Sequence, residues 1–358
     1  MLSGNKGEWS EIYTLLKLIA DGEMLKGDSE LVPLHNENYK VIALERIEAT
    51  TGKTSYLITG ETVAVSNSKK SVTLNRDIFS LEANKLLDSI KSQKGTFKLP
   101  STEQFMYEIL TFSVKAKSQD KADIKVEIHD HRTSIAHTRG FSIKSQLGSP
   151  STLLNASQQT VFRYKLENLT DIQAVEVSDI QGRGALIRRI QSLSELSNIN
   201  IIPYGSTSDT MSYNLRLMDD ALPDVVSSLL WNFYLHNTSK LDELLPYVSE
   251  QNIRYYDSDG KDLLYSTKLK RLLVSAALGM KPSQRWNGKY DANGGYLIVL
   301  KSGEIISYHI YDKDDFEGYL FHNTKLDTPS TSRYSTGNVL KIDSDYFIDL
   351  GLQIRFCS

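Results

Sequence analysis

The sequence predicts an α/β protein in which helices flank a mixed β-sheet core, followed by a mostly helical middle segment and a β-rich C-terminal part. Three observations predict this fold class. Apolar residues in the opening segment recur with helical spacing. Segments that alternate between apolar and polar residues form two groups, at 41–65 and 123–147. Beyond them, the pattern is helical over 183–278 and changes to short β-rich segments after Gly294.

The first third of the chain combines a helix, a meander of strands and two more helices. The opening helix, Trp9–Leu25, is predicted from the spacing of Ile12, Leu15, Leu16 and Ile19. Gly60-Glu61 is the turn inside the meander, and Gly95 and Pro100 separate the two later helices. The predicted strands are Val41–Glu48, Ser55–Thr59 and Thr62–Val65, and the later helices are Asp77–Ser92 and Ser101–Phe112.

A β-hairpin with a long loop is predicted at the centre of the chain. Asp123–Ile128 and Phe141–Leu147 both alternate as strands, and the polar stretch His129–Gly140 reads as the loop between them. A turn centred between Ser134 and Ile135 would place Lys144 opposite Lys125.

The remainder is divided between helices and strands, and this change of pattern predicts three segments. These are a core at 1–182, a mostly helical segment at 183–280 and a β-rich segment at 281–358, with Pro282 and Gly288 breaking the pattern near the second boundary. The predicted helices are Arg183–Leu196, Leu222–His236, Leu241–Val248 and Lys261–Leu278, and the predicted strands are Tyr296–Leu300, Ile305–Ile310 and Tyr346–Phe356.

The amino-acid composition excludes few classes of protein. The 358 residues are 40% hydrophobic and 24% charged, as in an ordinary globular protein, and the net charge of −3 argues neither for nor against a nucleic-acid partner. The single cysteine, Cys357, excludes a disulfide framework and a Cys-based zinc site. We find no apolar run near the ~20 residues of a membrane span and no signal-peptide pattern, so we expect a cytoplasmic protein with no membrane partner.

One face of the predicted hairpin gathers groups that suit phosphodiester hydrolysis. By the period-2 rule Ser142, Lys144 and Gln146 share a side with Asp123, while Phe141 and Ile143 face the core. A carboxylate can hold Mg²⁺, and a lysine can position or deprotonate an attacking water. The alternative is an ordinary half-exposed hairpin with a solvated lysine.

Three passages spread over nearly the whole chain carry a family resemblance. They are GNKGEWSEIYTLLKLIADG at the start, DIKVEIHDH with GFSIKSQLGSPSTLLNAS at the centre, and GGYLIVLKSGEIISYHI with TKLDTPSTSR and LGLQIRF near the end. The chain resembles the HpaII-type type II restriction endonucleases, within the PD-(D/E)XK nuclease superfamily. The resemblance implies a Mg²⁺-dependent DNA endonuclease that cuts at CCGG, with a companion cytosine methyltransferase acting on the same site.

The resemblance also implies roles for individual residues. Asp123 would be the first acid of the nuclease motif and Lys144 its lysine, while Ser142 stands where a second acid is usual. The missing acid would come from the opening helix, as Glu8 or Glu11, which lie three residues apart on one helical face. Their alternative role is to complement the dipole at the helix N-terminus.

Two further acids remain open as the first acid. Asp130 lies nearer the loop, where an aspartate commonly caps a turn, and the assumed register puts Glu127 opposite Ser142. Gly148 and Ser149, just after the lysine strand, would let a backbone amide approach a phosphate.

The C-terminal segment is the expected DNA-recognition part. Guanines are read best by arginine or lysine in the major groove, and hydroxyl groups bind phosphates or bases. The guanine-reading candidates are Lys325, Arg333 and Arg355, and the hydroxyl candidates are Thr328, Ser330 and Ser332. The alternative for this stretch is a Pro-containing surface loop between strands.

Three functions remain in competition at this point. CCGG is palindromic, so a restriction enzyme that cuts it would match the site as a homodimer. A repair or recombination nuclease on the same core would cut by DNA structure instead. A non-catalytic DNA-binding protein would keep the fold and lose cleavage, since Ser142 replaces an acid.

Overall fold

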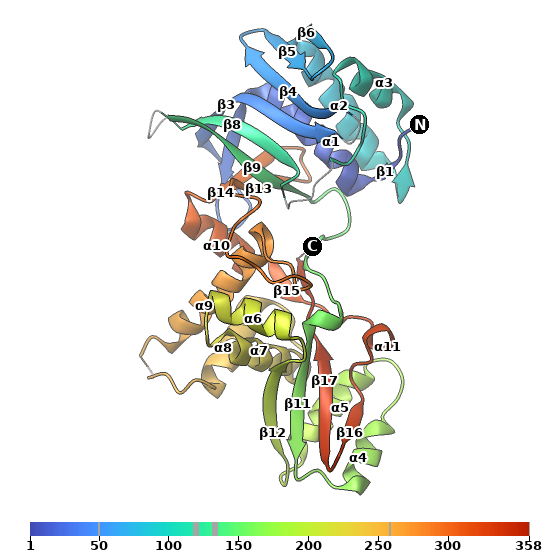
Figure 1. Cartoon of the computed structure of the whole chain (residues 1–358), viewed down its shortest axis with the longest axis vertical. Coiled ribbons are helices and arrows are strands. Elements are labelled where there is room, and N and C mark those ends of the chain that lie inside the picture. The colour runs from blue at the N-terminus through green and yellow to red at the C-terminus, as the bar shows by residue number, and fades with distance from the viewer. Residues whose placement is uncertain (49–50, 117–121, 131–134, 258, 358) are drawn as a thin grey trace. The chain divides into compact units, whose positions relative to one another are not determined.

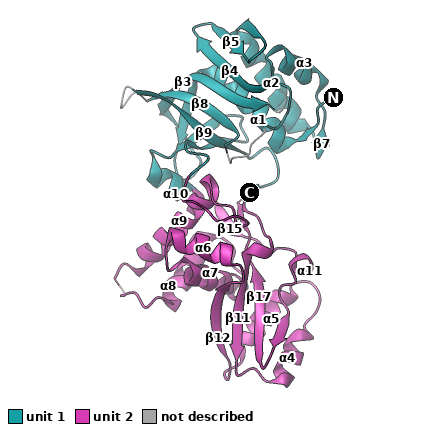
Figure 2. Ribbon diagram, viewed as in Figure 1, with its two compact units in different colours: residues 1–151, 290–319, 358 teal, residues 152–289, 320–357 magenta. Residues whose placement is uncertain are grey.

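The computed structural model describes residues 1–48, 51–116, 122–130, 135–257 and 259–357 (Figure 1). They form two compact units: unit 1 contains 1–151 and 290–319, and unit 2 contains 152–289 and 320–357 (Figure 2). The chain therefore passes between the units three times. Both units combine helices with sheets, and the predicted α/β class with a mixed sheet is confirmed.

Unit 1 is built on a nine-stranded mixed sheet. Its strand order is β2-β14-β13-β9-β8-β3-β4-β5-β6, and an additional pairing of β2 with β3 links the first six strands into a closed ring. The pairs β9–β13 and β2–β14 are parallel, and the others are antiparallel. The strands are β2 (Glu23–Gly27), β3 (Pro33–Glu48), β4 (Gly52–Thr59), β5 (Thr62–Ser66), β6 (Ser71–Asn75), β8 (Ile124–Asp130), β9 (Ile135–Ser145), β13 (Gly295–Val299) and β14 (Ile305–His309).

Helix α1 (Lys6–Asp21) packs against this sheet and supplies much of the core. Asn5 and Glu8 form a capping box at its start, and Gly22 ends it in the left-handed conformation, so it begins and ends earlier than predicted. The predicted apolar face is correct, because Ile12, Leu15, Leu16 and Ile19 are buried. The other helices that lie wholly in unit 1 are α2 (Arg76–Ser92) and α3 (Pro100–Glu108). The chain passes from unit 1 to unit 2 for the second time within α10 (Lys313–His322), after residue 319. Strand β1 (Gly4–Asn5) pairs with β7 (Thr96–Phe97).

The register of the central hairpin differs from the prediction. Lys125 pairs with Gly140 and Glu127 with Thr138, so Lys144 does not face Lys125 and Ser142 does not face Glu127. The strands continue to Asp130 and from Ile135, into the polar stretch that was predicted to be loop. Of the two residues at the centre of the predicted turn, Ile135 begins β9 and Ser134 lies outside the described part. The strand pairing, rather than apolar alternation, extends the hairpin. Phe141 and Ile143 are buried, as predicted.

The two units divide the chain at points other than 182 and 280. Residues 290–319, predicted as part of the C-terminal segment, place β13 beside β9 in the sheet of unit 1. Residues 152–182, predicted as part of the core, belong to unit 2. Local periodicity predicts a strand but not the sheet that it joins, so a return of the chain after 140 residues leaves no local signal.

Unit 2 contains two smaller antiparallel sheets and most of the helices. One sheet has the order β12-β11-β17-β16 and the other β10-β18-β15. Its strands are β10 (Thr152–Leu154), β11 (Val161–Glu167), β12 (Asn200–Ser206), β15 (Thr324–Leu326), β16 (Val339–Ile342), β17 (Asp345–Gly351) and β18 (Ile354–Phe356). Its helices are α4 (Asp171–Ser178), α5 (Ala185–Glu195), α6 (Asp209–Met218), α7 (Leu222–His236), α8 (Leu241–Gln251), α9 (Lys261–Leu278) and α11 (Thr331–Tyr334), with a 3₁₀ turn at Gln158–Thr160.

Gly295→Ala tests the close packing of β13 in unit 1. Gly295 has φ +111°, and a Cβ there would lie 1.9 Å from the carbonyl oxygen of Tyr308. We expect the substitution to lower the free energy of unfolding by more than about 2 kcal/mol, measured by urea denaturation. Gly60→Ala is the control, because Gly60 also has a positive φ but open space around it, and it should cost only about 1 kcal/mol. Equal losses in the two variants would contradict this packing.

Candidate active site

A pocket of about 870 Å³ in unit 1 is lined by four of the predicted catalytic and metal-binding residues, namely Glu8, Glu11, Asp123 and Lys144. Its walls come from the start of α1, the residues just before β7, the segment after α3, and the ends of β8 and β9 that lie away from the hairpin turn. The charged residues that line it are Glu8, Glu11 and Asp123, and Lys6, Lys94, Lys115 and Lys144. Gly148 and Ser149 line it too.

Asp123, Ser142 and Lys144 form a chain of hydrogen bonds at this pocket. The Nζ atom of Lys144 donates to Oγ of Ser142 (2.9 Å), and Oγ of Ser142 donates to Oδ2 of Asp123 (3.1 Å). The backbone N–H of Ile143 also donates to Oδ2 of Asp123 (2.7 Å). The expected grouping of these three side chains is therefore present, and β8–β9 pairing brings it about.

Lys144 is partly buried and has several charged residues close to it. Its Nζ atom is 5.0 Å from the ring centre of Tyr296 on the neighbouring strand β13. Burial lowers the pKa of Lys144, and Lys115 lowers it slightly further, while Asp123 and Glu11 act in the opposite direction. A lysine with a lowered pKa gives up its proton more readily than an exposed lysine, which suits it to proton exchange.

Glu11 is the second acid beside Asp123. Its carboxylate is 11% exposed, and Oε2 accepts a hydrogen bond from the backbone N–H of Ala116 (3.0 Å). Burial raises the pKa of Glu11 to about 7, and the charge of Asp123 raises it too. The Ala116 hydrogen bond, Arg46 and Lys115 act to lower it.

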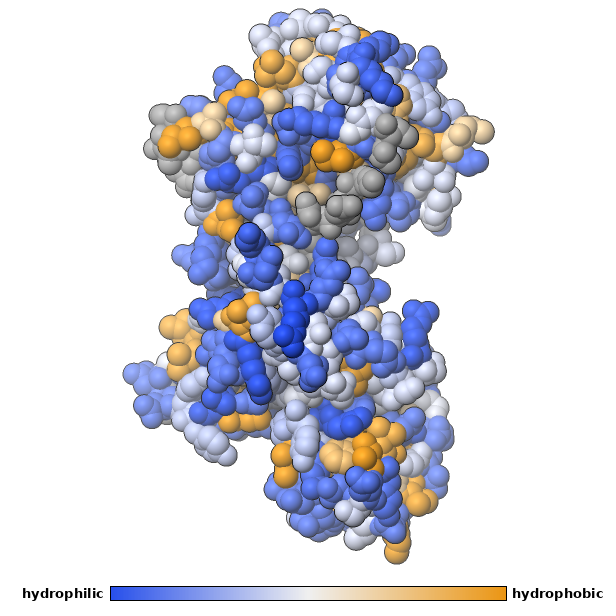
Figure 3. Space-filling view, viewed as in Figure 1, coloured by the Kyte–Doolittle hydropathy of each residue, from blue (hydrophilic) through white to orange (hydrophobic). Residues whose placement is uncertain are grey.

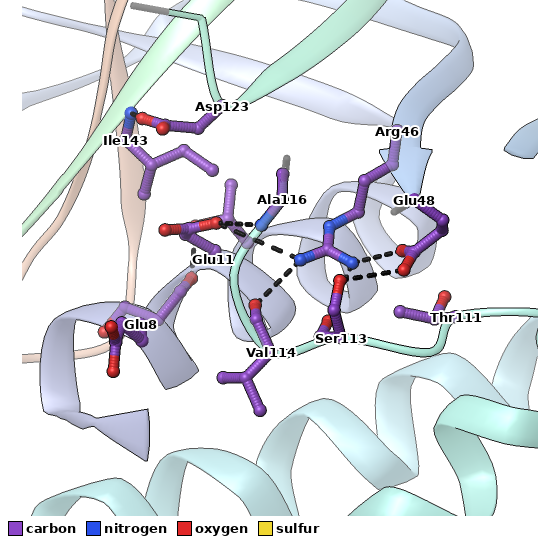
Figure 4. A network of polar contacts seen from close by, with 12 residues as sticks. Glu8, Glu11, Arg46, Glu48, Thr111, Ser113, Val114, Ala116, Asp123 and Ile143 are labelled. Atoms are coloured by element: carbon purple, nitrogen blue, oxygen red, sulfur yellow. Dashed lines mark hydrogen bonds and ion pairs between the residues drawn. The ribbon is translucent and has the colours of Figure 1, made fainter. Parts of the chain in front are cut away.

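Glu8 lines the same pocket but has a different local role. Its Oε2 atom accepts a hydrogen bond from the backbone N–H of Asn5 (2.9 Å), and the side chain of Asn5 accepts one from the N–H of Glu8 (3.0 Å). Glu8 thus caps α1, which is the alternative that the sequence left open. In Figure 4, Glu11 lies between Glu8 and Asp123.

Three other candidates lie apart from this pocket. The side chain of Gln146 does not line it and accepts a hydrogen bond from the backbone N–H of Lys301 (3.4 Å). Glu127 pairs with Thr138 further along β8 and does not line it either. Asp130 ends β8 at the hairpin turn, opposite the end that carries Asp123, and its side chain lies outside the described part.

Sequence reasoning missed several residues around the pocket. Lys94 and Lys115 line it from loops, where no periodicity marks them. Arg46 and Glu48 are buried beside Glu11, on β3. A signal for this pair existed, because Leu44, Arg46 and Glu48 share one face of an alternating strand whose apolar member belongs to the core.

The predicted DNA-binding residues lie in unit 2. Lys325 on β15 pairs directly with Arg355 on β18, and Arg355 forms an ion pair with Asp327 (3.0 Å). Arg333 is exposed on the short helix α11. Thr328, Ser330 and Ser332 line a second pocket, of about 940 Å³, together with Arg183 and the start of α5.

Comparison with known proteins identifies the class. The family model for the HpaII restriction endonuclease matches residues 5–356. The chain is 38% identical over 358 residues to the type II restriction enzyme HpaII of Haemophilus parainfluenzae, covering 99% of this chain and 98% of that one. It is therefore a type II restriction endonuclease, a site-specific deoxyribonuclease that acts on DNA. Within that class it belongs to the HpaII restriction endonuclease family, which confirms the resemblance seen in the sequence.

No solved structure matches the chain. In the described part of the chain no helix is long and apolar enough to span a membrane, and the face shown in Figure 3 is mainly hydrophilic, with hydrophobic residues in scattered groups. Type II restriction endonucleases generally use divalent metal ions.

Glu11→Gln tests whether the buried acid strains the fold. With a folded-state pKa of about 7 against an ordinary value of 4.5, Glu11 destabilises the native state increasingly as the pH rises between those values. Without metal at pH 8, we expect Glu11→Gln to raise the free energy of unfolding by about 1–3 kcal/mol, with a much smaller gain at pH 4.5.

The control is Glu8→Gln, one turn earlier on α1. Glutamine keeps the capping box, so this variant should change stability little at either pH. Urea denaturation of both variants in EDTA measures the difference. A Glu11→Gln variant that is no more stable than the wild type at pH 8 would contradict the raised pKa.

Proposed function

We propose that this enzyme cleaves double-stranded DNA within CCGG, in a Mg²⁺-dependent reaction at the pocket that contains Glu11, Asp123 and Lys144. The observation that carries the proposal is the hydrogen-bonded chain from Lys144 through Ser142 to Asp123, with a second acid in the same pocket. The CCGG target rests on the similarity to HpaII-type enzymes that the sequence carries. This chemistry fits a variant PD-(D/E)XK site.

The residues present fit a magnesium ion. Mg²⁺ is usually bound through one or two carboxylates, with waters and substrate phosphate oxygens completing its shell. Asp123 and Glu11 supply two carboxylates, and no cluster of three or more His, Cys, Asp or Glu suited to a metal exists in the described ranges. Glu8, whose carboxylate caps α1, is not assigned as a ligand of the ion. When bound, the ion would stabilise negative charge on the phosphoryl oxygens.

Lys144 and Ser142 then act on the attacking water. With its pKa lowered by burial, the Lys144 amine can take the proton of a water held beside the scissile phosphate. Ser142 fixes both partners, since its hydroxyl accepts from Lys144 and donates to Asp123. Ser142 stands where the motif usually has an acid, so the strand lacks one negative charge. In this proposal Glu11 on α1 supplies that charge. Gln146 and Asp130 have no part in this scheme.

Lysines around the pocket suit the DNA backbone. Lys6, Lys94 and Lys115 line it beside the two acids, where they would neutralise phosphates on either side of the cleaved bond. The Gly148-Ser149 turn provides backbone that a phosphate can approach closely.

Unit 2 supplies the proposed recognition residues. The adjacent Lys325 and Arg355 on β15 and β18 are suited to guanine, and Arg333 is exposed nearby in the sequence. Thr328, Ser330 and Ser332 lie with Arg183 in one hollow, which suits contacts to phosphate oxygens.

The palindromic target and the family suggest the biological setting. A homodimer would offer one active site to each strand of CCGG. A companion cytosine methyltransferase would protect the host's own CCGG sites, and both enzymes would act in the cytoplasm. The family match favours this reading over a structure-specific repair nuclease or a non-catalytic DNA-binding protein.

Lys144→Ala tests the proposed chemistry. A plasmid containing CCGG should give discrete fragments ending at CCGG with Mg²⁺ and the wild type, and none with EDTA. Lys144→Ala should cut at least about 1,000-fold more slowly, because the group that accepts the water proton is lost. Lys125→Ala is the matched control: Lys125 is exposed on the same hairpin and does not line the pocket.

Three results would contradict the proposal in different ways. Discrete cleavage at another sequence would rule out CCGG as the target and leave the proposed chemistry unaffected. Cleavage of nicks or flaps regardless of sequence would favour the repair nuclease, and Mg²⁺-independent binding without any cleavage would favour the non-catalytic protein.

Arg355→Ala tests recognition by unit 2. Loss of a guanine contact should weaken binding of the variant to CCGG by about 1–3 kcal/mol. Binding to a site with one altered G·C pair should change less, so the variant should distinguish the two sites less well than the wild type does. The control is Lys341→Ala, an exposed lysine on β16 that is paired with Asp171. Electrophoretic mobility shifts in EDTA at fixed salt measure both variants. Equal loss of affinity for the two DNA sites would show a phosphate contact only.

A further inference from the structure

Two charged side chains are buried beside the pocket without lining it. Arg46 and Glu48 lie on β3, with side chains 2% and 0% exposed, and they form an ion pair with each other. A buried ion pair is often no more stabilising than apolar residues of similar size, because both charges lose their hydration. Stability alone therefore does not account for this pair, and its further contacts are informative.

Both members of the pair hold the segment that follows α3. Arg46 donates from Nη1 to the carbonyl oxygen of Ser113 (2.8 Å) and from Nη2 to that of Val114 (2.7 Å). Oε2 of Glu48 accepts from the backbone N–H of Phe112 (3.1 Å) and from Oγ of Ser113 (2.8 Å). The segment 112–114 is thus fixed through four hydrogen bonds to two side chains of one strand. Figure 4 shows Arg46 and Glu48 beside Ser113 and Val114.

The next two residues of that segment reach the pocket. Lys115 lines it, and the backbone N–H of Ala116 donates to Oε2 of Glu11. Nη2 of Arg46 itself lies 4.0 Å from the same oxygen. One carboxylate oxygen of Glu11 is therefore oriented by Arg46 twice, directly through charge and indirectly through the backbone that Arg46 holds.

We propose that Arg46 and Glu48 are positioning residues for metal binding, which fix the carboxylate of Glu11 and the backbone of Lys115 in the arrangement that the ion and the DNA phosphate require. This inference rests on the proposed function, because it assigns Glu11 to the metal. It goes further by placing the determinant of metal affinity on a strand that contributes no side chain to the pocket.

The geometry requires an arginine at position 46. The planar guanidinium presents several N–H groups in a fixed fork, and here it contacts two carbonyl oxygens and two carboxylates from one side chain. A lysine ammonium keeps the charge but cannot span two neighbouring carbonyls in the same way. Arg46→Lys should therefore retain the fold and loosen the 112–116 segment.

The first experiment replaces the whole pair, Arg46→Met with Glu48→Met, so that neither member of the pair is left buried without the other. Calorimetric titration with Mn²⁺, without DNA, should show affinity lowered by about 10-fold or more, as for other residues that orient metal ligands. The matched control replaces a bidentate pair in unit 2 that does not line the pocket, Arg163→Met with Asp349→Asn. It should leave Mn²⁺ affinity unchanged even where its melting temperature falls.

The second experiment uses Arg46→Lys and keeps the test decisive if the double variant fails to fold. Its Mn²⁺ affinity should lie between the wild type and the double variant. In steady-state cleavage its kcat should fall at fixed Mg²⁺ by a larger factor than KM for DNA rises, because Lys115 is only one of several lysines that would contact the phosphates. Loss of stability alone would leave the affinity of the folded fraction unaltered.

The outcomes separate this inference from the proposed function. Wild-type Mn²⁺ affinity in both Arg46 variants overturns the inference alone and leaves a purely structural ion pair. A wild-type chain that binds no metal overturns the inference together with the assigned metal site. Cleavage at a sequence other than CCGG overturns the proposed target, while lowered metal affinity in the variants still supports the positioning role.

Discussion

The parallel pairing of β13 with β9 is the constraint on which the rest of unit 1 depends. It makes β9 an interior strand, so Lys144 lies beside Tyr296 instead of projecting from a sheet edge. Burial there lowers the pKa of the amine, which a solvated hairpin could not do. On its other side, β9 pairs with β8 and brings Asp123 within hydrogen-bonding distance of Ser142. A structural pairing between segments 150 residues apart thereby sets the chemistry of one amine.

The site combines charges that the fold would otherwise avoid. Burial raises the pKa of Glu11 to about 7, and the negative charge of Asp123 acts in the same direction. Arg46, Lys115 and the Ala116 amide offset part of it. This balance is typical of a site arranged for a cation, because a divalent ion would neutralise both carboxylates at once. The same residues are a source of instability when no ion is bound.

Some of this was accessible from the sequence and some was not. Periodicity predicted the buried face of α1, although not its ends, and assigned Phe141 and Ile143 to the core, with Ser142 and Lys144 on the other face. Period-2 reasoning is insensitive to a register shift of an even number of residues, which is why the grouping with Asp123 held although Lys144 does not face Lys125. Spacing on a helix could not separate Glu8 from Glu11, because the distinction depends on loop 112–116, which folds against β3. The division of the chain between two units depends on long-range pairing and has no local signature.

The threefold crossing of the chain between the units has a consequence for synthesis on the ribosome. All the ionisable residues that line the pocket have been synthesised once the chain reaches Lys144. The strand that pairs with the strand of Lys144 begins only at Gly295, after most of unit 2 has been synthesised. A partly translated chain therefore holds the acids and the lysine without the environment that lowers the pKa of its amine. Under the catalytic role proposed for Lys144, this order of assembly would withhold the reactive amine from incomplete chains and couple the onset of cleavage to the near-completion of the polypeptide.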